Sequence, residues 1–145
     1  MSYWENKKVL VTGGAAFLGS YLVEFLVEDG ADVTVVDNLE RGRLENLSAV
    51  IKDILFIQKD LRDPAICEEV TKGMDMVMNL AAKVTGIHYN RYHHGEMFTS
   101  NILMSTNVLE AARNNGVRRC LLLGLSIDRW LSTPPGLRFR ISVTV

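Results

Sequence analysis

The sequence predicts an α/β fold built on a doubly wound parallel β-sheet, and three observations predict it. Short apolar runs rich in β-branched residues alternate with segments of helical periodicity, the pattern of a parallel sheet covered on both faces. The first run ends at Thr12-Gly13-Gly14, and a helical pattern follows at once. The second run ends at Asp37, about 20 residues beyond this turn. Right-handed crossovers then give the strand order 3-2-1-4-5, with a ligand crevice at the carboxyl ends of the first and fourth strands.

Five strands and four helices are expected in the first 123 residues. The strands are predicted at 7–12, 33–36, 54–57, 76–80 and 120–123, and the helices at about 17–29, 44–50, 64–70 and 97–115. Gly30 follows the first helix at the position usual for a left-handed cap. Gly73 and Gly116 mark the ends of two others.

Residues 1–123 are therefore expected to form one domain, followed by a tail at 124–145 that departs from the pattern. The tail contains Pro134-Pro135-Gly136 and shows no helical period. Its only regularity is an apolar alternation at every second residue from 139 to 145, which is compatible with one last strand.

Composition and charge exclude several classes of function. The net charge of −1 gives no reason to expect nucleic acid or an acidic membrane as a partner. The two cysteines, Cys67 and Cys120, stand in unrelated contexts and indicate neither a disulfide framework nor a zinc site. Residues 1–8 lack the apolar core of a signal peptide, and no apolar run approaches the ~20 residues that span a bilayer. The cytoplasm is the expected compartment.

The turn after the first strand predicts a binding site for a phosphate or pyrophosphate, because it brings backbone N–H groups and the positive end of a helix to one point. Gly13, Ala16 and Gly19 occupy the three positions of a G-x-x-G-x-x-G turn. At Ala16, where the backbone approaches a pyrophosphate, a methyl group replaces a hydrogen, and a positive φ there would cost of order 1 kcal/mol. The alternative is an ordinary turn between a strand and a helix, in which glycines are common.

Carboxylates follow the second and third strands at the same edge of the expected sheet. Asp37 stands where a carboxylate accepts both hydroxyls of an adenosine ribose, and it would repel a 2′-phosphate, so NAD is favoured over NADP. The alternative is that Asp37-Asn38 only begins a turn. Asp60-Leu61 either contacts the adenine or caps the helix near Pro64.

The fourth strand runs into small residues and then a loop with histidines. Small side chains in Asn79-Leu80-Ala81-Ala82 would let a dinucleotide lie across the strand ends; the alternative is close helix packing. His88, His93 and His94 lack spaced cysteine or carboxylate partners, so they are interpreted as surface residues of the loop at 85–95, and no metal site is predicted.

These residues form an ordered set of motifs, to which Asn101 and the segment from Asn107 to Arg113 with Gly116-Val117 also belong. The set resembles the extended short-chain dehydrogenase/reductase family, specifically its NAD-dependent nucleotide-sugar epimerases and dehydratases. Within that family, residues 81–113 resemble GDP-mannose 3,5-epimerases more than other branches. The resemblance implies a Rossmann-type fold and an NAD site of which these residues are part: Gly13, Ala16, Phe17, Leu18, Gly19, Asp37, Asn38, Asp60, Leu61, Leu80, Ala81, Ala82 and Asn101.

The family's chemistry requires residues that this chain does not show. In such enzymes NAD takes a hydride from a sugar carbon and returns it, and the tyrosine of a Tyr-x-x-x-Lys pair is the base. No tyrosine follows Tyr92 and no lysine follows Lys83. Ser126 is the one candidate for the Ser or Thr that orients the sugar hydroxyl.

The portion that would hold the sugar nucleotide is also missing from this chain. The resemblance therefore implies an NAD-binding portion that is inactive alone, with a tail that fits a frameshift or a fragment. The rival interpretation is a non-catalytic dinucleotide-binding or dimerising module. In either case the helix at 97–115, which in relatives helps to form the dimer interface, implies a homodimer.

Overall fold

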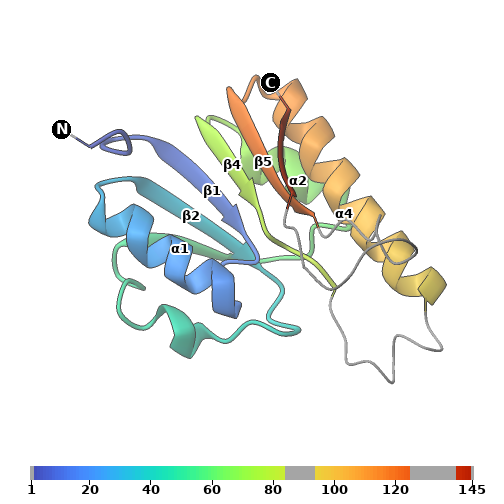
Figure 1. The fold of residues 1–145 in the computed structure, drawn as a ribbon, viewed down its shortest axis with the longest axis horizontal. Helices are drawn as coiled ribbons and strands as arrows, with labels where there is room; N and C mark the ends of the chain where they lie inside the picture. The colour runs from blue at the N-terminus through green and yellow to red at the C-terminus, as the bar shows by residue number, and fades with distance from the viewer. Residues whose placement is uncertain (1, 84–93, 125–139, 145) are drawn as a thin grey trace, which may run out of the picture.

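The sheet has the predicted strand order, extended by one strand. The computed structural model describes residues 2–83, 94–124 and 140–144. Its sheet runs β3-β2-β1-β4-β5-β6, and the first five of these strands are mutually parallel (Figure 1). The strands are β1 (Lys8–Thr12), β2 (Asp32–Asp37), β3 (Ile54–Gln58), β4 (Met76–Asn79), β5 (Arg119–Gly124) and β6 (Arg140–Thr144). The strand order reverses between the paired strands β1 and β4, so a ligand crevice is expected outside their carboxyl ends.

Helices cover both faces of this sheet (Figure 1). On one face, α1 (Phe17–Glu28) and the 3₁₀ turn η1 (Leu44–Leu47) pack against β1 and β2. On the other face lie α2 (Pro64–Thr71) and α4 (His94–Asn114), which also pack against each other. The buried strand residues divide between the two faces by alternation, so Val9, Val11, Val33 and Val35 join α1, whereas Leu10, Val36 and Val77 join α2 and α4.

The three glycines that were expected to end helices adopt the left-handed backbone conformation, which was predicted explicitly for Gly30. Gly30, Gly73 and Gly116 have φ values of +87°, +73° and +67°. At the end of α1 the Ala31 N–H donates to the Leu26 carbonyl, the longer hydrogen bond of a helix that stops at a glycine. The positions of these glycines in the sequence therefore predicted the C-terminal ends of α1, α2 and α4 to within a few residues.

The helix predicted at 44–50 was wrong in length. The structure has only the 3₁₀ turn η1, followed by turns. Two buried apolar residues, Leu47 and Val50, anchor the segment on the face that carries α1. The Arg43 N–H and the Asn46 side chain both donate to the Ala15 carbonyl, and these bonds tie the segment to the turn after β1. The segment therefore combines short turn hydrogen bonds of its own with these tertiary ones.

The last strand of the predicted alternation is present, and it joins the sheet edge. β6 pairs antiparallel with β5 over Cys120–Gly124 and Arg140–Thr144. The remainder of the expected tail, residues 125–139 and 145, lies outside the described residues. Among the helices that the structure describes, none is long and apolar enough to cross a membrane.

Candidate functional site

A cleft with a volume of about 200 Å³ lies at the carboxyl ends of β1, β2, β3 and β4. Eight of the predicted site residues line it: Gly13, Ala16, Asp37, Asn38, Leu61, Leu80, Ala81 and Ala82. Five more predicted residues do not line it, namely Phe17, Leu18, Gly19, Asp60 and Asn101. Ser126 falls outside the described residues. The crevice is therefore where the strand order predicted it.

The glycine turn is packed so closely that side chains would not fit. Gly13 has a φ of +69°, and a Cβ there would lie 2.9 Å from backbone atoms of Ala81. A Cβ on Gly19 would lie 2.2 Å from the Gly13 carbonyl oxygen. The Gly13 N–H donates to the Val36 carbonyl at 2.8 Å, which joins the turn to β2. Both glycines are thus required by close approach of backbone to backbone.

Ala16 does not carry the strain considered from the sequence. Its φ is −81° and its ψ is 170°, ordinary extended backbone for the N-cap of α1. No side chain caps this helix end, and the methyl group of Ala16 lines the cleft. The side chains of Phe17 and Leu18 point to solvent, with exposed fractions of 77% and 55%. Only the backbone of these two residues is therefore placed to bind a ligand at the helix N-terminus.

Asp37 is buried at the end of β2, with an exposed fraction of 8%. Its Oδ2 accepts the Ala15 N–H at 3.0 Å, and its Oδ1 accepts the Leu39 N–H at 2.8 Å. A Cβ on Gly42 would lie 2.8 Å from Oδ2 and 2.9 Å from Oδ1. Because a carboxylate offers about four lone pairs and two are used here, both oxygens can accept further hydrogen bonds from a ligand. The alternative that Asp37 begins a turn is also realised, through its bond to Leu39.

The loop after β2 holds one strained residue. Leu39 has a φ of +59°, in the left-handed region that disfavours residues with a Cβ, at a cost of about 1 kcal/mol. The hydrogen bond from its N–H to Asp37 stabilises this conformation. Asn38 accepts the Glu40 N–H at 2.9 Å in the same way. The loop thereby doubles back and brings Arg41 and Gly42 to the cleft.

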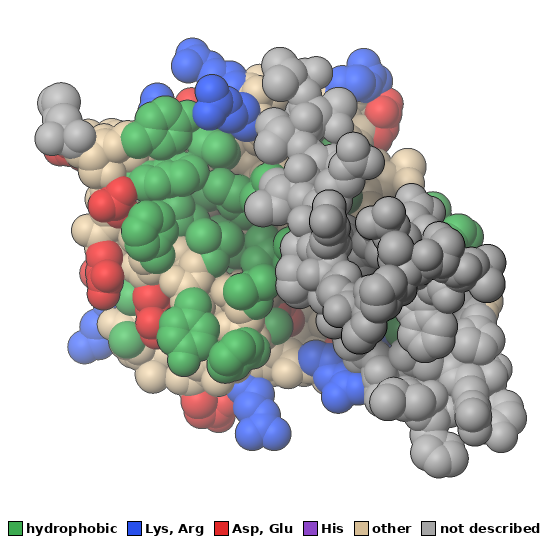
Figure 2. Space-filling model, viewed as in Figure 1, with side chains coloured by type: hydrophobic (Ala, Val, Ile, Leu, Met, Phe, Trp, Pro, Cys, Tyr) green, Lys and Arg blue, Asp and Glu red, His purple; other side chains and the backbone are tan. Residues whose placement is uncertain are grey.

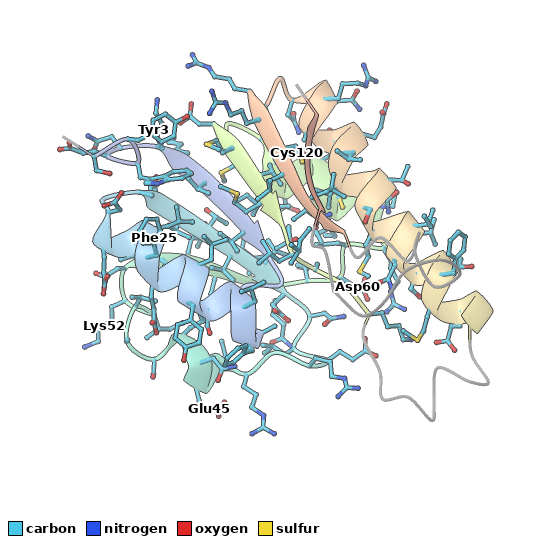
Figure 3. The ribbon with its side chains drawn as sticks, in the orientation of Figure 1. Tyr3, Phe25, Glu45, Lys52, Asp60 and Cys120 are labelled. Carbon is cyan, nitrogen blue, oxygen red and sulfur yellow. The ribbon has the colours of Figure 1, made fainter. Side chains whose placement is uncertain are left out.

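Asp60 is engaged by a neighbouring cation. Arg62 donates to both oxygens of Asp60 through Nε and Nη2, with its Nη2 2.5 Å from Oδ2. These hydrogen bonds hold the pKa of the Asp60 carboxyl below its usual range. The interpretation of Asp60 as a helix cap is wrong, because Asp63 caps α2 by accepting the Ala65 N–H at 2.9 Å. Asp60 lies near the end of the sheet that holds the cleft (Figure 3).

A buried polar bond joins the two strands that flank the crevice. Thr12 on β1 donates through its hydroxyl to Oδ1 of Asn79 on β4 at 2.5 Å, and both residues are buried. The same hydroxyl accepts the Ala81 N–H at 3.1 Å. The backbone that follows β4 is therefore fixed where it enters the cleft.

Asn101 acts on the backbone of Lys83. From α4 its Oδ1 accepts the Lys83 N–H at 2.7 Å, and its Nδ2 donates to the Lys83 carbonyl at 3.2 Å. The Lys83 ammonium lies 2.6 Å from a Glu96 carboxylate oxygen and 4.0 Å from one of Glu40. Asn101 thus positions the segment after β4, which is a role that the motif did not reveal.

The cleft carries more positive charge than the sequence analysis expected. Nine lining residues were not predicted: Val36, Glu40, Arg41, Gly42, Lys59, Arg62, Lys83, Ser100 and Met104. Four of them are cationic, against the two carboxylates of Asp37 and Glu40, but Arg62 and Lys83 are paired with Asp60 and Glu96, which neutralises half of this positive charge within the protein. Lys59 directly follows β3, and Arg41 and Arg62 lie four residues after the ends of β2 and β3, so the rule that ligands bind at strand ends could have found these three.

No group of three or more potential metal ligands exists among the described residues. His88 and His93 lie outside them, and His94 begins α4. The site therefore consists of an uncapped helix end, a glycine turn, a buried carboxylate and a cationic rim.

Comparison with known proteins identifies the family of the chain that carries this site. Residues 9–126 match the model of the NAD dependent epimerase/dehydratase family. The chain belongs to this family. It is 34% identical to the GDP-mannose 3,5-epimerase of Arabidopsis thaliana over 119 residues, covering 81% of this chain and 31% of that protein. It is also 34% identical to UDP-glucuronic acid decarboxylase 1 of Arabidopsis thaliana, covering 77% of this chain and 25% of that protein.

Solved structures of the family share the fold. The dTDP-glucose 4,6-dehydratase of Streptomyces venezuelae, solved with NAD, superposes with a TM-score of 0.72 at 27% identity. The match covers 78% of this chain and 38% of the dehydratase. The chain thus spans between a quarter and two fifths of the length of these relatives. Equal identity to an epimerase and to a decarboxylase does not separate the branches of the family, and decarboxylases were not among the expected classes.

Proposed function

We propose that this chain binds NAD in the cleft at the carboxyl ends of β1, β2 and β4. The observation that carries the proposal is the buried Asp37 carboxylate, which lies against the glycine turn with two lone pairs left for the hydroxyls of a ribose. The dehydratase of Streptomyces venezuelae supports it, because that relative was solved with NAD.

The residues present fit a dinucleotide. The close packing at Gly13 and Gly19 leaves the N-terminus of α1 open to a pyrophosphate, with Ala16 beside it. Leu61 and the cationic side chain of Arg62 line the wall for the adenosine end. Leu80, Ala81 and Ala82 also line the cleft, and bound NAD would supply a hydride acceptor.

Isothermal titration calorimetry tests this proposal. NAD should bind more tightly than NADP, because the Asp37 carboxylate repels a 2′-phosphate. Asp37→Ala should weaken NAD binding and reduce the difference between the affinities for NAD and NADP. Asp53→Ala, which removes an exposed carboxylate from the loop before β3, is the matched control and should bind both as the unmutated chain does. Equal affinity of the unmutated chain for NAD and NADP would contradict the assignment.

The larger function that we propose is that of the NAD-binding portion, residues 1–123, of a nucleotide-sugar epimerase or dehydratase. This chain alone should not convert sugar nucleotides, because a general base must reach the substrate hydroxyl with a suitable pKa and no Tyr-x-x-x-Lys pair follows the fifth strand. Incubation with NAD and a panel of UDP-, GDP- and dTDP-sugars, followed by chromatography, should show no product. Turnover that is lost in Ser126→Ala would reveal a site built on that serine.

A second candidate function is dimerisation through α4, and one observation favours it. Phe98, Ile102 and Leu109 follow each other on the helix at spacings of four and seven residues, and each is exposed, Ile102 by 50%. Ile102→Glu should abolish a dimer formed by this face in sedimentation experiments. A cytoplasmic location also belongs to the proposal, consistent with the two free cysteines.

A further inference from the structure

The outer face of α1 is apolar, although nothing in the described structure covers it. The helix buries Gly19, Ser20, Val23 and Leu26 against the sheet. On the opposite side lie Phe17, Leu18, Tyr21 and Phe25, with exposed fractions of 77%, 55%, 61% and 52%. Large apolar side chains are therefore exposed on the side of α1 that faces away from the sheet, where a surface helix typically carries polar residues. Figure 2 shows hydrophobic side chains gathered over α1, and Figure 3 labels Phe25 on this helix.

Three aromatic residues form a ridge along this face. Phe17, Tyr21 and Phe25 stand four residues apart, so they lie above one another on consecutive turns. The rings of Phe17 and Tyr21 already pack edge to face, with their centroids 5.3 Å apart and an interplanar angle of 77°. Because Tyr21 lies midway, the ridge is symmetric in size and spacing about it. A second copy of the helix, running antiparallel, would set Phe17 against Phe25 and Tyr21 against Tyr21.

The charges of α1 favour the same arrangement. The helix has no acidic residue in its first turn and no basic residue in its last turn. Glu24 and Glu28 lie in its second half, near the negative end of the helix dipole, where a carboxylate is unfavourable. In an antiparallel pair these carboxylates approach the positive N-terminus of the other copy, so association replaces an unfavourable interaction with a favourable one.

We propose that the outer face of α1 is an isologous interface through which two copies of this chain associate, with the helices antiparallel and crossing at Tyr21. Ridges of residues four apart interdigitate in the commonest class of helix packing. The four exposed side chains present roughly 400–500 Å² per copy, so the pair buries on the order of 1,000 Å², the size of a weak, reversible dimer. This surface lies on the opposite side of the sheet from α4.

Sedimentation velocity across roughly 1 µM to 1 mM should show a reversible monomer–dimer equilibrium. Tyr21→Lys places two like charges at the crossing point and should weaken the dimer by about tenfold or more. Leu55→Lys is the matched control, because Leu55 is exposed by 59% on the other face of the sheet, and it should leave the equilibrium unchanged. Circular dichroism checks that both variants are folded.

Cross-linking tests the geometry itself. With a short bifunctional maleimide, Tyr21→Cys should link to itself, and Phe17→Cys should link to Phe25→Cys in a mixture faster than either links to itself. The native Cys67 and Cys120 are buried, which keeps the background low. A chain that remains monomeric up to the highest concentration overturns the proposal. A dimer that is lost in Ile102→Lys and retained in Tyr21→Lys also overturns it and assigns association to α4.

Discussion

The Asp37 carboxylate accepts the Ala15 backbone N–H at 3.0 Å, which joins the end of β2 to the turn that follows β1. The opposite side of Ala15 is held too, because its carbonyl accepts the Arg43 N–H at 3.0 Å and the Asn46 side chain at 2.8 Å. The two loops that would hold the adenosine and the pyrophosphate of a dinucleotide therefore form one unit. A site assembled in this way before binding loses little ordering entropy when a ligand arrives.

Gly42→Ala should disrupt this unit. The added Cβ would lie 2.8 Å from the Ala15 Cβ and within 2.9 Å of both Asp37 oxygens, so the loop must move away from the glycine turn. We expect a loss of roughly 1–3 kcal/mol in the free energy of unfolding, measured by urea denaturation, together with weaker NAD binding. Gly95→Ala is the control: nothing lies within 4 Å of that site on α4, so alanine should leave stability equal or higher. Equal stability of Gly42→Ala and the unmutated chain would contradict the close approach.

Ala16→Gly should change NAD affinity by less than about threefold in calorimetry. The φ of −81° means that alanine is unstrained at this position, so removing the methyl group relieves nothing in the backbone. Ala16→Val should weaken NAD binding by tenfold or more, about 1.4 kcal/mol, because the larger side chain would fill the cleft beside the helix N-terminus. A large gain in affinity with glycine would show that the methyl group obstructs the pyrophosphate.

The Cys67 thiol should make stability fall at high pH. Burial raises its pKa from an ordinary value of 9.0 to about 11. A raised folded-state pKa gives stability that is complete below pH 9 and is lost as the pH rises from 9 to 11, because the unfolded chain ionises first. We expect the unmutated chain to lose up to about 2 kcal/mol more than Cys67→Ala across this window. Urea denaturation of both proteins at several pH values measures this difference. If the free energy of unfolding fell equally with pH in both proteins, the thiol would be in contact with solvent.

Much of the fold was readable because its signals are local. Each β-branched run is a strand, and the glycine after α1 adopts the expected left-handed backbone. The segment at 44–50 could not be read in this way, since its form depends on hydrogen bonds from Arg43 and Asn46 to Ala15, roughly 30 residues earlier. Nothing in the segment itself distinguishes a 3₁₀ turn from a short helix.

The sequence predicted those site residues that are identified by their residue type and by their position at the end of a strand. Asp37 and the glycine turn face one cleft as expected. The choice between Asp60 and Asp63 as a helix cap was open to sequence reasoning, because the cap directly precedes a proline at the first helical position, and Pro64 follows Asp63. The approach of Gly42 to Asp37 had no local signal, because it arises from the positive φ of Leu39.

The hydroxyl of Thr12 is used twice: it donates its proton to Asn79 and accepts the Ala81 N–H. Across the part of the chain that the structure describes, every buried side-chain nitrogen or oxygen has a hydrogen-bond partner. The polar side chains beneath the cleft are therefore already paired within the protein, so a ligand gains little by competing for them. Discrimination between ligands is then expected to depend on the groups that line the cleft, namely the carboxylate of Asp37 and the cationic side chains, so selectivity can be altered there while the Thr12–Asn79 layer stays intact.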